Sequence, residues 1–143
     1  MPVIDTSDAS SAEILDFLNE LLEAERAGAR VALDSARQAP AGPLVRLLED
    51  IRHDEARWCA MLLGQIARAG GQASPRMGAF HEKAMAIEDL RERLVFLNRG
   101  QGWVVRKLRE MVPRVRDEEL YAELAHMLSS HVANISLTNA AIG

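Results

Sequence analysis

The sequence contains little cysteine and few aromatic residues. Its single cysteine, Cys59, cannot form a disulfide within the chain, and one thiol is too few for a zinc finger. Because only 4% of the 143 residues are aromatic, the hydrophobic core must consist mainly of aliphatic side chains and methionine. The shares of hydrophobic residues (48%) and charged residues (27%) are nevertheless typical of a globular protein, which excludes global disorder.

Excess positive charge and long apolar runs are also lacking. The formal net charge of −4 excludes an overall positive field that would hold nucleic acid. No stretch approaches the roughly 18 consecutive apolar residues of a membrane-spanning helix, and the first residues lack the pattern of a secretory signal. We therefore expect a cytoplasmic protein with one domain, residues 1–143, and with neither a nucleic-acid nor a membrane partner.

Apolar residues recur at helical spacing along most of the chain, and no strand candidate exceeds a few residues. Local signals mark the helix ends: Ser10 and Glu13 form a capping box, Pro43 suits a first helical position, Pro113 stops a helix, and Asp117 can cap one. The predicted helices span residues 11–36, 43–68, 86–111 and 117–142.

Four helices of about 26 residues each predict an all-α four-helix bundle. Short connections follow the first and third predicted helices and would make two helical hairpins. Residues 70–85 contain Gly, Ser and Pro and form the longest non-periodic stretch. Some 15 extended residues reach ~50 Å, the full length of a bundle. This long connection suits the crossover of a ferritin-like bundle, and an up-down bundle with a loose loop would accommodate it as well.

Several polar residues fall on the apolar faces of the predicted helices when positions are placed ~100° apart. All of them lie near the middle of their helices, so they would share one level in a bundle of equal-length helices. The sequence therefore predicts one buried polar layer between hydrophobic layers. Its members are Glu25, Glu55 with Asp54 at the edge of the face, Asn98, Gln101 and His131.

A buried, unpaired carboxylate costs several kcal/mol, so the two glutamates of this layer need compensation. Three kinds are available: a metal ion, a positive charge from a protonated His131 or an inward-reaching arginine, and neutral carboxyl groups with raised pKa values.

The polar layer resembles the ferritin-like di-iron carboxylate superfamily. That superfamily has Glu on the first and third helices and Glu-x-x-His on the second and fourth. Glu25, Glu55 and His131 match ligand positions on the first, second and fourth helices, and residues 53–62 are similar to the second-helix signature. Residues 97–108 resemble a small uncharacterised family of bacterial ferritin-like domains.

The ligand set of that superfamily is incomplete in this chain. Trp58 stands where the second helix should offer His, Asn98 or Gln101 where the third should offer Glu, and Leu128 where the fourth should offer Glu. Three of the six ligand positions are therefore unmatched, and a two-metal site is not expected.

The resemblance thus implies one metal ion, either Fe, Mn or Zn, rather than two. Its ligands would be Glu25, Glu55 and His131, with Gln101 or Asp54 assisting. A ferritin-like metal-binding protein with one degenerate site, acting in redox or storage chemistry, is the first hypothesis. The alternative is a non-catalytic structural or protein-interaction module with a metal-free buried polar network, in which the amides of Asn98 and Gln101 donate hydrogen bonds to the glutamates.

Other residues that suggest chemistry have simpler interpretations. Glu123 and His126 form a complete Glu-x-x-His, but both lie off the apolar face and are expected to be a surface pair. Trp58 is expected to pack in the core with its indole N–H near Gln101 or a carboxylate. Cys59 is expected to be buried and unreactive.

Two large aromatic residues, Phe96 and Trp103, project from the side of the third predicted helix that is opposite its apolar face. They predict a contact patch, and a homodimer through this outer face is the preferred interpretation. The competing interpretation is that Phe80 and Met77 of the long connection cover the patch.

Overall fold

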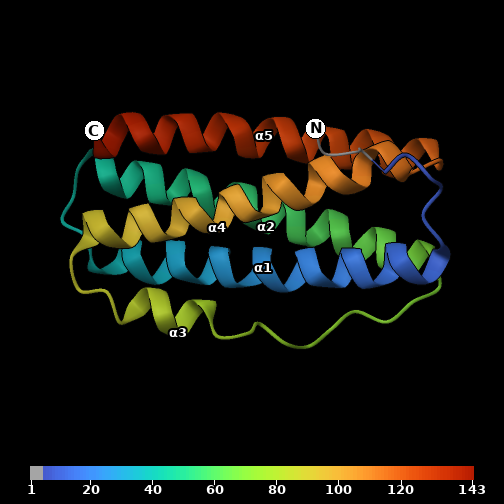
Figure 1. Ribbon diagram of the computed structural model, residues 1–143. Coiled ribbons are helices and arrows are strands. Elements are labelled where there is room, and N and C mark those ends of the chain that lie inside the picture. Colours follow the sequence, from blue (N-terminus) through green and yellow to red (C-terminus); the bar gives the residue numbers. More distant parts are fainter. Residues whose placement is uncertain (1–4) are drawn as a thin grey trace.

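The computed structural model describes residues 5–143, and this part of the chain contains helices and no strands (Figure 1). The predicted all-α class is therefore confirmed. None of the helices in residues 5–143 is long and apolar enough to cross a membrane. Four long helices dominate the structure, and two short elements lie in the connections between them. They are α1 (Ser11–Gln38), α2 (Pro43–Arg68), α3 (Phe80–Met85), α4 (Leu90–Met111), the 3₁₀ turn η1 (Val112–Arg114) and α5 (Glu118–Ile142).

Local sequence signals set three of the helix starts as predicted. The Ser10 hydroxyl accepts a hydrogen bond from the Glu13 N–H while the Glu13 side chain accepts one from the Ser10 N–H, which completes the capping box of α1. Pro43 occupies the first turn of α2. The Asp117 carboxylate accepts from the N–H of Leu120 and caps α5.

The predicted helix over residues 86–111 begins too early. In the structure α4 begins at Leu90, because the Asp89 backbone is extended and its carboxylate caps the helix by accepting from the Glu92 N–H. The Arg93 guanidinium donates two hydrogen bonds to the Ile87 carbonyl and holds the preceding turn in place. The apolar periodicity continues across this turn, so the spacing alone did not reveal the break.

The connection between α2 and α4 runs the length of the helices along the outside of α1, as Figure 1 shows. Consequently α1 and α5 point in one direction, and α2 and α4 in the other (Figure 1). The connection is fastened to α1: the Arg26 guanidinium donates to the carbonyls of Ser74 and Arg76, and the Asn19 side chain accepts from the Ser74 N–H at 2.7 Å. It is a crossover held on the surface of α1 rather than a loose loop.

The buried apolar side chains form two separate clusters. One joins the first half of α1 to the second halves of α2 and α4 and the first half of α5, and it includes Leu18, Leu62 and Leu124. The other joins the opposite ends of α1, α2 and α4, and it includes Val31 and Ile51. A polar layer lies between the two clusters, as the sequence predicts.

Candidate metal centre

Three side chains from three different helices converge in the polar layer. Glu25 of α1, Glu55 of α2 and His131 of α5 each offer one ligand atom, and these atoms lie within 4.8 Å of one another. The three residues are only 1%, 5% and 1% exposed, respectively. Helical periodicity places each side chain inward, and the similar depth of the three positions along their helices brings them to one level.

Hydrogen bonding fixes the orientation of the His131 imidazole. Its Nδ1 lies 3.0 Å from the carbonyl oxygen of Met127, one turn earlier in α5. Because a carbonyl can only accept, Nδ1 carries a proton, and Nε2 faces Glu25 at 2.6 Å from Oε1. That distance is within the range of an ion pair, which the two groups form when the imidazole is protonated. In neutral His131, Nε2 therefore carries a free lone pair, which is the tautomer of a metal-binding histidine.

Burial and mutual proximity shift the pKa values of Glu25 and His131. Burial raises the pKa of Glu25, and the neighbouring imidazole counteracts only part of this effect. For His131, burial by itself lowers the pKa, but the Glu25 carboxylate and the Met127 carbonyl together raise it above the ordinary value. Between their two titrations the pair shares one proton, in addition to the proton on Nδ1 of His131. Glu55 then adds a further carboxylate to the same layer, and a divalent cation would balance both acids at once.

Gly28 provides the space for the Glu55 carboxylate. A Cβ atom at position 28 would lie 3.0 Å from the carboxylate carbon of Glu55 and 3.0 and 3.1 Å from its oxygens. Glycine inside a helix costs about 1 kcal/mol relative to alanine, so its presence on the inner face of α1 calls for a reason. The glycine on the inner face of α1 is visible in the sequence, but the reason for it, the Glu55 carboxylate, lies on the neighbouring helix α2.

Buried polar atoms without hydrogen-bond partners gather at this level of the structure. Among the described residues they include Oε2 of Glu25, both amide atoms of Gln101 and the indole nitrogen of Trp58, whereas Oε1 of Glu25 and Nε2 of His131 face each other at 2.6 Å. Because buried polar groups in proteins are nearly always paired, this group of unpaired atoms is unusual. It also shows that the expected hydrogen bond from Trp58 to Gln101 or a carboxylate is absent. The Trp58 ring does pack in the hydrophobic core.

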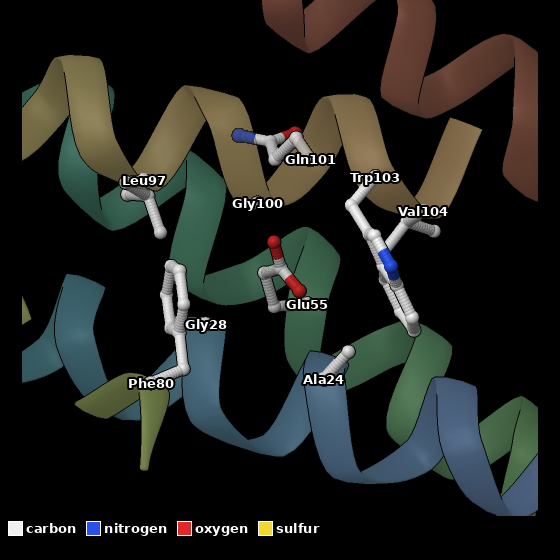
Figure 2. A pocket seen from close by; sticks show the side chains of 9 residues that line it. All are labelled: Ala24, Gly28, Glu55, Phe80, Leu97, Gly100, Gln101, Trp103 and Val104. Atoms are coloured by element: carbon white, nitrogen blue, oxygen red, sulfur yellow. The ribbon is translucent and has the colours of Figure 1, made fainter. Parts of the chain in front are cut away.

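Three further polar residues of the predicted layer have different surroundings. Gln101 is buried and lines the same cavity as Glu55 (Figure 2). Asp54 is half-buried, accepts a hydrogen bond from the Asn134 side chain at 2.9 Å, and lies outside the converging group. The Asn98 amide donates to the Asn139 side chain at 2.8 Å and to the Ile135 carbonyl, both in α5. The expectation that Asn98 donates to a glutamate is therefore wrong.

A cavity of about 260 Å³ adjoins the centre between α1 and α4. Figure 2 shows the Glu55 carboxylate among the lining residues, with Phe80 on one side, Trp103 on the other and Gln101 opposite. Glu55 and Gln101 supply its polar side chains, and the remaining lining is apolar or glycine. The other lining residues are Ala24, Gly28, Leu97, Gly100 and Val104.

The two aromatic residues predicted to form an outer contact patch are partly covered. Phe96 stacks on Phe80 of α3, with ring centroids 4.8 Å apart and planes 14° apart. Trp103 is half-buried and forms a wall of the cavity. The competing interpretation, cover by Phe80, is therefore confirmed for Phe96, because the crossover lies over this face of α4. The homodimer through this face stays a prediction.

The remaining candidates lie outside the converging group. His126 is exposed, Glu123 is half-buried, and neither joins the converging group. Cys59 is half-buried, and burial, together with the charge of Glu25, raises the pKa of its thiol to about 11. Three buried polar residues were missed: Ser35, Thr138 and Arg93. Arg93 is 4% exposed and donates to Ser35 and Gln38 of α1. Its position three residues after Leu90 and four before Leu97 is a sequence signal that could have identified it, because this spacing places it beside the apolar face.

Comparisons with known proteins give a family without a known activity. Residues 12–140 match the model of a domain of unknown function (DUF6306). Neither the curated proteins nor the solved structures include a match to this chain.

Proposed function

The chain belongs to the DUF6306 family, and we propose that it is a metal-binding protein that holds one divalent transition-metal ion between Glu25, Glu55 and His131. The observation that carries the proposal is the convergence of two buried carboxylates and one buried imidazole from three helices. Two carboxylates and an imidazole nitrogen suit Fe, Mn or Zn, and they do not select one of these metals.

Three features of the site support a metal rather than an empty polar layer. The lone pair of His131 Nε2 faces the carboxylates, because the Met127 carbonyl holds the proton on Nδ1. Oε2 of Glu25 has no hydrogen-bond partner among the described residues. One divalent ion would also offset the charge of two buried acids, whose desolvation otherwise costs several kcal/mol each.

We further propose that the fold is ferritin-like. The crossover between α2 and α4 and the resulting directions of the four long helices support this assignment (Figure 1). When bound, iron or manganese would supply redox chemistry and zinc would supply Lewis-acid chemistry. The protein would contribute three buried ligands, whose two carboxylates balance the charge of the ion. The Gln101 amide, which lines the same cavity as Glu55, would orient a water or other small molecule.

Elemental analysis of protein purified without a metal-affinity tag tests the proposal. We expect about one equivalent of Fe, Mn or Zn per chain, which Glu55→Gln and His131→Ala lose. Matched controls are Glu23→Gln, two residues from Glu25 on the same helix, and His53→Ala on the exposed side of α2; both should keep the metal. Wild-type protein that takes up none of the three metals, and gains no thermal stability when they are added, would contradict the proposal.

The close contact between His131 and Glu25 favours a second candidate, a metal-free structural network. At 2.6 Å the two groups can form an imidazolium–carboxylate pair that fixes the register of α1 against α5. In that case chelator treatment leaves the melting temperature unchanged. A metal centre predicts instead that chelator lowers the melting temperature and that added metal restores it.

A further inference from the structure

We infer that the cavity between α1 and α4 binds a small monocyclic phenol, with the ring between Phe80 and Trp103 and the hydroxyl between Glu55 and Gln101. The inference names the ligand class of the same centre and rests on the proposed function through Glu55, which both share.

The size and the lining of the cavity indicate a compact apolar body. Its volume of about 260 Å³ exceeds the roughly 150 Å³ of an apolar protein cavity that binds benzene. The side chains of Phe80 and Trp103 lie on either side of Glu55, and Leu97 and Val104 complete the apolar wall (Figure 2). A flat ring packs well against such surfaces, because aromatic side chains favour stacked or edge-on contacts with other rings.

Glycines keep the cavity open. A Cβ at Gly28 would crowd the Glu55 carboxylate, and a Cβ at Gly100 would lie 2.8 Å from the Phe80 ring. The rim residues Ala24, Phe80, Gly100 and Trp103 are only half-buried, whereas Glu55 and Gln101 are buried. A ligand entering from the rim therefore meets apolar surface first and the two polar groups at the inner end.

The polar groups specify a hydroxyl. Gln101 is 3% exposed, and neither its amide nitrogen nor its amide oxygen has a hydrogen-bond partner among the described residues. A hydroxyl donates one hydrogen bond and accepts others, so it can donate to the Glu55 carboxylate and accept from the Gln101 amide nitrogen. A ring without a hydroxyl would leave the Glu55 carboxylate and the Gln101 amide without a partner in the cavity.

The test compares two fluorinated probes by ¹⁹F NMR titration of wild-type protein. 4-Fluorophenol carries the hydroxyl, and fluorobenzene has the same ring without it. We expect 4-fluorophenol to bind at least about tenfold more tightly, because only it satisfies Glu55 and Gln101. Equal affinity of the two probes, or no binding of 4-fluorophenol, would overturn the inference.

Two variants locate the probe in this cavity. Ala24→Leu fills the rim and should abolish binding of 4-fluorophenol, whereas Ala29→Leu, five residues later on α1 and not in the cavity lining, should preserve it. Gln101→Leu should weaken 4-fluorophenol about tenfold and leave fluorobenzene unchanged. Retention of full affinity in Ala24→Leu, with helical circular dichroism intact, would also overturn the inference.

Titrations of chelator-treated and metal-loaded protein separate the two proposals. If the wild-type protein takes up no metal but binds 4-fluorophenol, the metal centre is contradicted and the cavity inference is supported. Metal uptake without binding of 4-fluorophenol supports the centre and overturns the cavity inference.

Discussion

Gly28 of α1 and Glu55 of α2 fit against each other at the middle of the helices: the carboxylate occupies the space that a side chain at position 28 would fill. This contact places an acidic group where two helices approach closely and where apolar clusters lie on either side. The small residue on one helix thus allows the buried charge on the other, and the candidate centre depends on both.

Replacing Gly28 with alanine should displace the Glu55 carboxylate and weaken metal binding. Outer-shell changes at metal sites typically cost about 10- to 100-fold in affinity. Gly64→Ala is the matched control, because nothing lies within 4 Å of a Cβ there; it should stabilise the protein by up to about 1 kcal/mol through helix propensity alone. Metal titration and urea unfolding of both variants measure these effects. Equal metal affinity in the two variants would contradict the role assigned to Gly28.

The pair formed by Glu25 and His131 should be strongly coupled in the metal-free protein. Removing one member of a buried pair typically costs about 3–5 kcal/mol, because the other remains buried without a partner. We therefore expect Glu25→Leu and His131→Leu to be strongly destabilising one at a time, and the double variant to cost clearly less than the sum. Urea unfolding of chelator-treated protein measures this double-mutant cycle. Additive effects would show that the two side chains do not interact.

Cys59 should react slowly with alkylating reagents in the folded protein. Burial raises the pKa of its thiol from 9.0 to about 11. Since the thiolate is the nucleophile, this rise in the pKa lowers the fraction of Cys59 that is thiolate at pH 8 about 100-fold. The rate with iodoacetamide should therefore increase steadily with pH up to about 11, and addition of urea should restore an ordinary rate. A fast reaction of the folded protein at pH 8 would contradict the burial of this thiol.

Arg93 should contribute to stability by fixing the start of α4 against the end of α1. Its buried guanidinium donates to the Ile87 carbonyl and to the side chains of Ser35 and Gln38. Arg93→Ala should cost about 2–4 kcal/mol, because three acceptors, of which Ser35 is buried, lose a charged donor together. The exposed Arg99 on the same helix is the matched control, and its replacement by alanine should stay within about 0.5 kcal/mol. Thermal and urea unfolding compare the two variants.

The aromatic stack between Phe80 and Phe96 should hold the crossover on α4. Phe80→Ala removes the cover from Phe96, and we expect the free energy of unfolding to fall by about 1–3 kcal/mol in urea unfolding. This is below the 3–5 kcal/mol of a fully buried phenylalanine, because Phe80 is only half-buried.

Sizing chromatography of the wild type and of Phe96→Ala tests the predicted homodimer separately. A dimer mass that falls in the variant supports an interface through this face, and a monomer mass in the wild type excludes it.

The sequence by itself determined the helical class, the caps at Ser10 and Asp117, and the inward direction of Glu25, Glu55 and His131. These features follow from short-range rules: the period of 3.6 residues and the hydrogen-bonding needs of helix ends act within a few residues of each position.

Only the tertiary structure decided what lies next to each inward or outward side chain. The phase of α4 gave the same indication for Asn98 and Gln101, yet one bonds to α5 and the other lines a cavity with Glu55. Phase also placed Phe96 outward, and Phe80 covers it because the non-periodic connection returns along α1. Contacts of this kind depend on where a segment distant in sequence comes to rest. That is set by the packing of all the helices together, so no local pattern encodes it.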